Sequence, residues 1–304
     1  MIVKTFVCGT LIRRTLAVII TYLYPMPITT TIITGATSGI GEETALALAK
    51  KDHALYLLVR NTEKGGQLKK RLVAETGNTH IFVVQCDLAD MRSVHQAANE
   101  LKAKLFAVNV LINNAGGIFN ERELTKDGFE MTFAVNHLGH FLLTTSLMPL
   151  LEKGHARIIN LSSDAHKFGK PMFDDLQAEQ GYSSIKAYGM AKLFNIYFTK
   201  SLAEKYADKG ITAFALHPGV VNTGFGAGTS GFVKFILWLG RPFMITAEKG
   251  AQTPVYLATA PKLDKQSGQY FVKKKPAKSG PLANDTEARN RLWKISEELI
   301  SPFC

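Results

Sequence analysis

The chain has 304 residues, of which 46% are hydrophobic and 20% charged, a balance that supports a large core and excludes wholesale disorder. The 36 Lys and Arg against 25 Asp and Glu give a net charge of +11, but no arginine-rich tract or zinc-finger spacing accompanies it, so nucleic acid is not an expected partner. Three widely spaced cysteines, Cys8, Cys86 and Cys304, exclude a disulfide framework and favour a reducing compartment, the cytoplasm.

Residues 1–28 form a basic and then apolar segment ahead of the first predicted strand. Arg13 and Arg14 precede the apolar run Leu16–Tyr24, which is too short to span roughly 30 Å of hydrocarbon as a helix. No small-residue cleavage site follows, so we favour a peripheral membrane anchor or a packed extension over a cleaved signal peptide. Pro25 and Pro27 mark the predicted boundary, and we expect one folded domain over residues 29–304.

Short apolar runs alternate with helical stretches from residue 29 onward. Strands are predicted at Thr30–Thr34, Ala54–Arg60, His80–Cys86, Val108–Asn113, Arg157–Ser162, Thr212–Leu216 and Gln269–Val272. Helices are predicted at about Ile40–Lys51, Thr62–Glu75, Met91–Leu105, Gly128–Leu151, Ser184–Lys209 and Ala247–Ala258. Several strand runs are apolar throughout, which is typical of parallel strands buried on both faces. The repeated β-α-β pattern predicts a single-domain α/β fold, a Rossmann-like doubly wound parallel sheet flanked by helices.

The first predicted strand runs directly into a glycine-rich turn, Gly35-Ala36-Thr37-Ser38-Gly39-Ile40-Gly41, and a helix follows. Glycines at such a junction permit a tight turn and a close approach of the backbone to a pyrophosphate at the positive end of the helix. A merely tight turn is the alternative, but the position between a strand and a helix favours a dinucleotide site.

The end of the second predicted strand indicates which dinucleotide binds. NAD-binding Rossmann folds place an acidic residue there to hold the ribose 2′-hydroxyl. Here the position is taken by Arg60, followed by Asn61 and Lys64. A guanidinium pairs with a 2′-phosphate by charge-assisted hydrogen bonds, so we predict NADP(H); the alternative is that Arg60 is a solvated strand end.

Tyr188 and Lys192 are four residues apart in a predicted helix, which places both on one face. A free tyrosine has a pKa of about 10, too high for a base near neutral pH, and a neighbouring ammonium favours the phenolate. The pair follows the fifth predicted strand and the serine pair Ser162-Ser163, which makes its position informative.

The motifs fall in one order along residues 29 to about 272: Thr34-Gly35-x-x-x-Gly39-x-Gly41, Asp87, Asn113-Asn114-Ala115-Gly116, Asn136, Ser163, Tyr188-x-x-x-Lys192 and Pro218-Gly219. In this order they resemble the short-chain dehydrogenase/reductase family. The stretch Ser162-Ser163-Asp164-Ala165-His166 and the tail Ser279-Gly280-Pro281-Leu282-Ala283 are similar to its retinol dehydrogenase-like branch.

The resemblance implies a role for each matching residue. Tyr188 would be the general acid/base, Lys192 would lower its pKa and bind the nicotinamide ribose, Ser163 would bind the substrate oxygen, and Asn136 would hold a water that links Lys192 to solvent. The expected cofactor contacts are Gly35, Thr37, Ser38, Gly39, Ile40, Gly41, Arg60, Asn61, Lys64, Asp87, Leu88, Asn114, Ala115, Gly116, Tyr188, Lys192, Pro218, Gly219, Val221 and Thr223.

The insert at about residues 224–246 contains a glycine-rich hinge and the apolar stretch Gly231–Gly240, which suit a lid over a lipophilic substrate. The alternatives are a segment that dips into a membrane surface and a helix packed on its own core or on a dimer partner. The branch resemblance implies retinal-like or other lipophilic aldehydes and ketones; steroid or xenobiotic carbonyls are alternatives. A non-catalytic NADP-binding sensor or scaffold is the rival function, and the oligomeric state, including a homodimer, stays open.

We expect no catalytic metal, because no carboxylate or thiol constellation accompanies His137, His140 and His166, which are expected to be hydrogen-bonded structural residues. Cys86 is expected to be a small core residue, and Lys273, Lys274, Lys275 and Lys278 a solvated loop.

Overall fold

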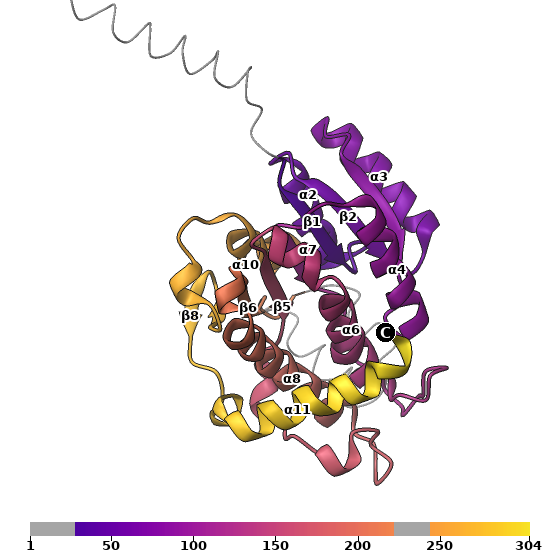
Figure 1. Ribbon diagram of the computed structural model, residues 1–304, viewed down its shortest axis with the longest axis vertical. Helices are drawn as coiled ribbons and strands as arrows, with labels where there is room; N and C mark the ends of the chain where they lie inside the picture. The colour runs from indigo at the N-terminus through magenta and orange to yellow at the C-terminus, as the bar shows by residue number, and fades with distance from the viewer. Residues whose placement is uncertain (1–27, 222–243) are drawn as a thin grey trace, which may run out of the picture.

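The computed structural model describes residues 28–221 and 244–304 (Figure 1). Its sheet has the strand order β3-β2-β1-β4-β5-β6-β7-β8. All neighbouring strands are parallel except the last pair, β7 and β8. The strands are β1 (Thr30–Thr34), β2 (Ala54–Val59), β3 (Ile81–Gln85), β4 (Val110–Asn113), β5 (Arg157–Leu161), β6 (Thr212–His217), β7 (Tyr270–Val272) and β8 (Lys275–Ala277). The predicted single-domain doubly wound sheet is therefore confirmed.

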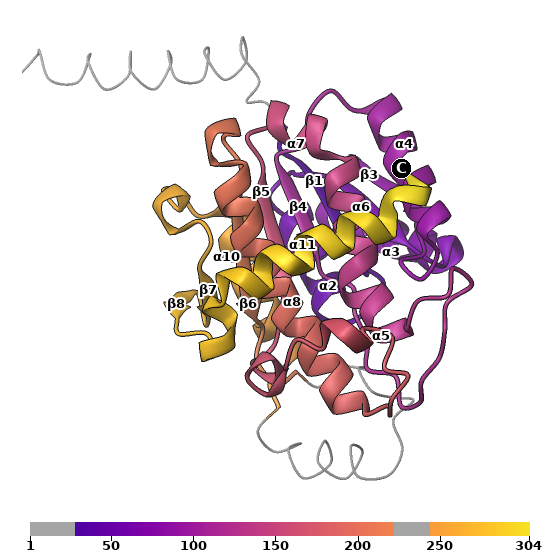
Figure 2. The ribbon, with the colours of Figure 1, turned by 60° about the horizontal axis from the view of Figure 1, so that its bottom comes forward.

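Helices cover both faces of the sheet. The side chains of α2 (Gly39–Ala49), α3 (Thr62–Thr76) and α10 (Ala247–Thr259) pack into the core on one face. On the other face lie α4 (Met91–Lys104), α6 (Gly139–Ser146) and α8 (Ser184–Lys205), with α11 (Thr286–Ile300) packed outside α8 (Figure 2). Neighbouring residues of one strand serve opposite cores, Ile32 one and Ile33 the other, which explains why these strands are apolar throughout.

The order of the strands creates a reversal point between β1 and β4. From β1 the chain builds outward first through β2 and β3, and then in the other direction through β4, β5 and β6. In open parallel sheets ligands bind at the carboxyl ends of the strands on either side of such a reversal. The predicted glycine turn follows β1 and Asn114 follows β4, so both stand at this point.

The predicted helical stretch Gly128–Leu151 is helical over most of its length, but it begins at Met131 and is divided into several elements. Glu130 caps a start at Met131, because its carboxylate oxygens accept from the backbone N–H groups of Thr132 at 2.7 Å and Phe133 at 2.8 Å. The helical region then consists of α5 (Met131–Phe133), the π-helical segment η1 (Ala134–Leu138), α6, and α7 (Met148–Lys153). Such π-helical turns often occur at functional sites, and η1 contains Asn136.

Two elements at the carboxyl end were not predicted. The lysine cluster is not only a loop: Lys273 and Lys274 form the turn of a hairpin whose second strand, β8, includes Lys275. The helix α11 buries Leu292 and Trp293, and the Trp293 ring lies 5.0 Å from that of Phe141. The helix α11 thus contributes to the core.

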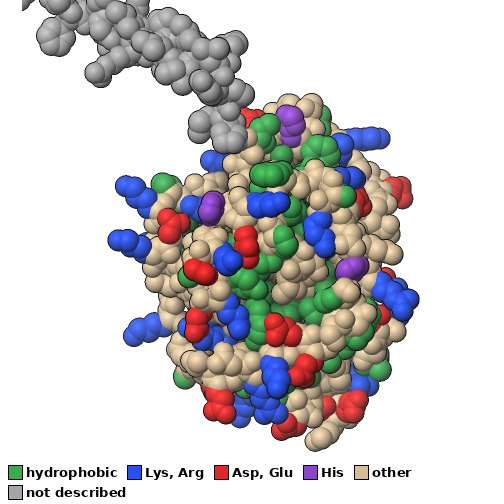
Figure 3. All heavy atoms as spheres, viewed as in Figure 1, with side chains coloured by type: hydrophobic (Ala, Val, Ile, Leu, Met, Phe, Trp, Pro, Cys, Tyr) green, Lys and Arg blue, Asp and Glu red, His purple; other side chains and the backbone are tan. Residues whose placement is uncertain are grey.

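On the face shown in Figure 3, Lys and Arg side chains are interspersed with Asp and Glu, so the excess positive charge does not form a continuous basic surface there. No helix within the described ranges has the length and apolar character needed to cross a membrane. The predicted amino-terminal anchor and nearly all of the predicted lid insert lie outside the described residues.

Candidate functional site

The glycine turn after β1 has the backbone geometry that only glycine adopts easily. Gly35 has φ +64° and Gly39 has φ +57°, both in the left-handed region. A Cβ on Gly35 would lie 2.8 Å from the Cα of Ala115, and a Cβ on Gly41 would lie 2.5 Å from the Asn114 amide nitrogen. The turn is therefore packed directly against the Asn114–Ala115 loop. At the start of α2, the side chain of Ser38 forms no hydrogen bond that caps the helix.

Thr34 fastens this turn to β4. Its hydroxyl oxygen accepts hydrogen bonds from the backbone N–H groups of Asn114 and Ala115, both at 3.0 Å. The Asn114 side chain donates to the carbonyls of Thr34 at 2.8 Å and Gly35 at 3.1 Å. The Thr34 hydroxyl also forms a hydrogen bond with His140 Nε2 at 2.9 Å. The two loops that flank the reversal point are thus one hydrogen-bonded unit.

The residues predicted to meet the adenosine end stand at the carboxyl ends of β2 and β3. Arg60 and Lys64 are exposed. Asn61 caps α3, because its side-chain oxygen accepts from the backbone N–H of Lys64 at 2.9 Å. Asp87 is half-buried, and its carboxylate accepts from the backbone N–H of Ala89 at 3.0 Å. Arg60 therefore remains free of the local capping role that Asn61 performs.

Ser163 lies in the loop after β5 with an extended backbone, φ −158° and ψ 158°. Its hydroxyl oxygen accepts from the backbone N–H of Ala165 at 3.2 Å and starts the 3-10 segment η2 (Asp164–Phe168). The neighbouring Ser162 points the other way, since its hydroxyl donates to the carbonyl of Lys192 at 2.7 Å. The two serines therefore have different roles: Ser162 anchors α8, and Ser163 is available at the edge of the sheet.

The first turns of α8 bring Tyr188 to Ser163. Gly189 packs against η2 so closely that a Cβ there would lie 2.9 Å from the carbonyl oxygen of Ala165. The Ser163 and Tyr188 side chains form a hydrogen bond. The Nζ of Lys192 donates to the carbonyl of Leu161 at 3.2 Å and lies 5.3 Å from the centroid of the Tyr188 ring.

Burial controls the ionisation of this pair. It raises the pKa of Tyr188 well above its ordinary value, against the opposing effect of the hydrogen bond with Ser163. It also lowers the pKa of Lys192 to about 7. Burial therefore dominates the pKa values of both groups, and the lowering of the Tyr188 pKa by Lys192 stays a prediction.

Asn136 lies near this pair and bonds the loop that follows Gly116. Its side-chain nitrogen donates to the carbonyls of Gly117 and Thr132, each at 2.9 Å, and its side-chain oxygen accepts from the backbone N–H of Gly117 at 3.3 Å. A Cβ on Gly116 would lie 2.5 Å from that oxygen and 3.1 Å from the Nζ of Lys192. Gly116 thus separates Asn136 from Lys192 with no room for a side chain.

The chain after β6 completes the edge. Gly219 has φ +101°, and Val221 forms a parallel bridge with Ile245. Val221 and Ile40 both lie against Gly250 of α10, since a Cβ there would be 2.8 Å from Val221 Cγ2 and 3.1 Å from Ile40 Cγ1. Thr223 lies outside the described residues.

A buried chain of polar side chains, which was not predicted, lies beneath the site. Asn113 donates to Asn160 Oδ1 at 2.8 Å, and Asn160 donates to Thr199 Oγ1 at 2.9 Å, which links β4, β5 and α8. The signal was present, because both asparagines interrupt otherwise apolar strands. The structural role expected for three histidines is confirmed: His137 bonds Ser296 at 3.1 Å, and His140 and His166 each have two partners.

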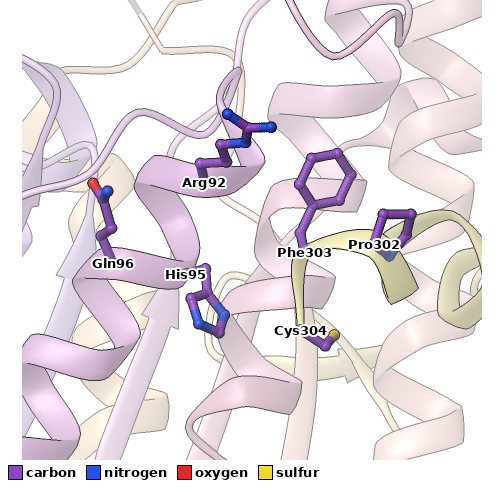
Figure 4. A pocket seen from close by; sticks show the side chains of 6 residues that line it. All are labelled: Arg92, His95, Gln96, Pro302, Phe303 and Cys304. Carbon is purple, nitrogen blue, oxygen red and sulfur yellow. The ribbon is translucent and has the colours of Figure 1, made fainter.

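Other features within the described ranges do not compete with this site. No group of three or more His, Cys, Asp or Glu residues there is arranged to hold a metal ion. Cys86 is a buried core residue, as predicted, and burial raises the pKa of its thiol to about 12. A hollow of about 300 Å³ lies between α4 and the carboxyl terminus, lined by Arg92, His95, Gln96, Pro302, Phe303 and Cys304 (Figure 4). None of the predicted site residues lines it.

Comparisons with known proteins agree with the geometry. A family model described as short chain dehydrogenase matches residues 29–230. The chain is 41% identical to retinol dehydrogenase 12 of Mus musculus over 271 residues, which is 88% of this chain and 85% of that protein. It is 40% identical to human retinol dehydrogenase 13, over 90% of this chain and 85% of that one. A solved structure of an uncharacterised Mycobacterium paratuberculosis protein is 30% identical with a TM-score of 0.73, over 90% of this chain and 93% of that one.

Proposed function

Because the chain belongs to the short-chain dehydrogenase family and is a dehydrogenase/reductase, we propose that it uses NADP(H) to interconvert a lipophilic aldehyde or ketone and its alcohol. In this proposal Tyr188 is the general acid/base. Ser163 binds the substrate oxygen, and Lys192 and Asn136 support Tyr188 from the cofactor side.

One observation carries the proposal: an unbroken series of contacts runs from the glycine turn to Tyr188. Gly35 packs on Ala115, Gly116 fits between Asn136 and Lys192, and Lys192 lies beside the Tyr188 ring. Tyr188 in turn is hydrogen-bonded to Ser163. The residues come from five separate segments of the chain, and a purely structural glycine turn would not require this convergence.

The residues present fit a dinucleotide. The tight approach at Gly35 and Gly41 leaves backbone rather than side chains at the start of α2, where a pyrophosphate is favoured by the helix dipole. When bound, the nicotinamide supplies the hydride, which is chemistry that no side chain can replace. Arg60 is exposed at the end of β2, where a 2′-phosphate would find a guanidinium.

The side chains of Ser163, Tyr188 and Lys192 then control the transfer of one proton. As a carbonyl is reduced, negative charge develops on its oxygen, and a hydrogen bond from the Ser163 hydroxyl stabilises that charge. The Tyr188 hydroxyl gives its proton to the same oxygen. A protonated Lys192 beside the phenol ring favours the phenolate that results, and its pKa of about 7 means that both protonation states are accessible near neutral pH.

Exposed apolar side chains at the rim of the site support the proposal of a lipophilic substrate. Phe168, the last residue of η2, is 74% exposed, and Ile185, one turn before Tyr188 on α8, is 40% exposed. Val220, after β6, is 53% exposed. Large apolar side chains left in water on three segments around one edge are typical of a surface that receives an apolar molecule. The two similar proteins named as retinol dehydrogenases are consistent with such a substrate.

The test is a panel of straight-chain aldehydes of increasing length, followed by the fluorescence of NADPH, with NADH in parallel. Burying one methylene is worth about 0.8 kcal/mol, so kcat/KM is expected to rise about fourfold per methylene until the pocket is filled. Equal rates for short and long aldehydes would contradict the lipophilic assignment. Tight NADPH binding with no oxidation of any aldehyde or retinal would favour the sensor instead.

A further inference from the structure

His166 is a buried histidine within η2 whose two ring nitrogens are both engaged. Nε2 accepts from the backbone N–H of Gly280 at 2.8 Å, and Nδ1 lies 2.6 Å from the carbonyl oxygen of Ser163. A backbone N–H can only donate, so Nε2 is the unprotonated nitrogen and Nδ1 carries the hydrogen that it donates to Ser163. Burial lowers the pKa of His166, which favours this neutral form.

Burial and the contact with Tyr270 hold the His166 ring in one orientation. It is 1% exposed and meets the Tyr270 ring edge to face, with the centroids 4.9 Å apart. The Tyr270 hydroxyl donates to the carboxylate of Asp164 at 3.2 Å. Tyr270 on β7, through Asp164, and Gly280 in the tail, through His166, thus both hold η2.

These contacts converge on the backbone of Ser163. Its carbonyl oxygen accepts from the His166 ring and also from the His166 backbone N–H at 3.0 Å. Its hydroxyl oxygen accepts from the backbone N–H of Ala165 at 3.2 Å. With the carbonyl fixed on one side, the hydroxyl is directed toward Tyr188, with which it is hydrogen-bonded.

We infer that His166 is a positioning residue that connects the carboxyl-terminal tail at Gly280 to the carbonyl of Ser163 and so fixes the hydroxyl that binds the substrate oxygen. The inference rests on the proposed function, because it takes the role of Ser163 from there. The bond from Gly280 sets the tautomer of the ring, so that Nδ1 carries the hydrogen that is donated to Ser163.

Two uncharged variants separate the bonds of the ring. In His166→Asn the amide nitrogen takes the place of Nδ1 and donates to Ser163, whereas the bond to Gly280 is lost. In His166→Gln the amide oxygen takes the place of Nε2 and accepts from Gly280, whereas the bond to Ser163 is lost. Each variant loses one hydrogen bond, so similar falls in the unfolding midpoint are expected for both.

The readout is kcat with NADPH and decanal, with thermal unfolding and NADPH binding measured on the same samples. We expect His166→Gln to have a kcat about fivefold or more below that of His166→Asn, with NADPH affinity unchanged. A kcat that falls in proportion to stability in both variants, or an unaltered kcat in His166→Gln, would overturn the inference. If His166→Gln does not fold, a loss of kcat in folded His166→Asn as large as that in Ser163→Ala overturns it, and a retained kcat supports it.

Ser163→Ala separates the inference from the function on which it rests. If Ser163→Ala loses about a hundredfold or more in kcat while His166→Gln loses nothing, only the inference falls. If Ser163→Ala keeps the wild-type kcat, the assignment of Ser163 in the proposed function falls as well.

Discussion

At the scale of single residues, the proposed preference for NADP(H) depends most on Arg60. It is exposed at the end of β2, and the neighbouring Asn61 supplies the cap of α3, so the guanidinium has no local structural task among the described residues. An acidic residue at this place would repel a phosphate, whereas a guanidinium binds it through paired donors.

We therefore expect Arg60→Asp to weaken NADPH binding by about tenfold to a hundredfold and to leave NADH binding the same or better. The control is Lys70→Asp, which makes the same change of charge at an exposed position on α3. Competitive kinetics with both cofactors checks the prediction. Equal effects of the two substitutions would show that net charge, rather than contact with the 2′-phosphate, is responsible.

At the scale of elements, the site depends on how closely η2 approaches α8. Gly189 and Gly169 face each other across this contact, and a Cβ on Gly189 would lie 2.9 Å from the Ala165 carbonyl oxygen and 3.2 Å from the Gly169 nitrogen. Backbone atoms cannot give way as side-chain ends do. The distance between Ser163 and Tyr188 is therefore set by two residues that take no part in the chemistry.

Gly189→Ala is expected to separate η2 from α8 and to lower kcat by about tenfold or more, with a loss of about 1–3 kcal/mol in the free energy of unfolding. Gly66→Ala on α3 is the matched control, because nothing lies within 4 Å of the added Cβ. There the same substitution should stabilise the chain by about 0.5–1 kcal/mol. Full activity of Gly189→Ala would contradict the account of how the two side chains meet.

The sequence predicted elements best where local signals act alone. The apolar runs of β1 and β2 and the glycine turn need no distant partner to be recognised. The π-helical segment within the predicted helix Gly128–Leu151 contains Asn136, whose side chain bonds Gly117 as well as its own helix, and no periodicity reports such a contact. Likewise α11 is a surface helix with one apolar stripe. The role of that stripe depends on the contact of Trp293 with Phe141, which is distant in the sequence.

At the scale of the whole molecule, the carboxyl-terminal helix and the site share a buried histidine. His137, in η1 beside Asn136, bonds the Ser296 hydroxyl of α11 at 3.1 Å and is surrounded by Phe133, Phe141, Phe194 and Phe198. Burial lowers its pKa to about 3, and that of His140 also to about 3. The folded chain thus keeps two histidines neutral that the unfolded chain protonates below its ordinary pKa of 6.5.

The lowered pKa values of these histidines determine how the free energy of unfolding changes with pH. Between about pH 6.5 and 3 the unfolded state binds more protons than the folded state, so the free energy of unfolding falls as the pH falls. Each such histidine lowers the free energy of unfolding by about 2 kcal/mol as the pH falls from 6.5 to 5. We expect His137→Phe combined with Ser296→Ala to remove about that amount from the difference between pH 7 and pH 5, measured by urea unfolding. Ser296→Ala alone is the control, and equal pH dependence in both would contradict the assignment.

In the proposed function the Tyr188 hydroxyl moves the proton beside a bound nicotinamide, and Tyr188→Phe removes that hydroxyl while retaining the ring near Lys192. The direct measurement is a single-turnover reaction of this variant with saturating NADPH and a long-chain aldehyde, with NADPH binding followed on the same sample. The account predicts wild-type binding of NADPH and a rate of its oxidation lower by about 10²-fold or more. Oxidation of NADPH at the wild-type rate would contradict it.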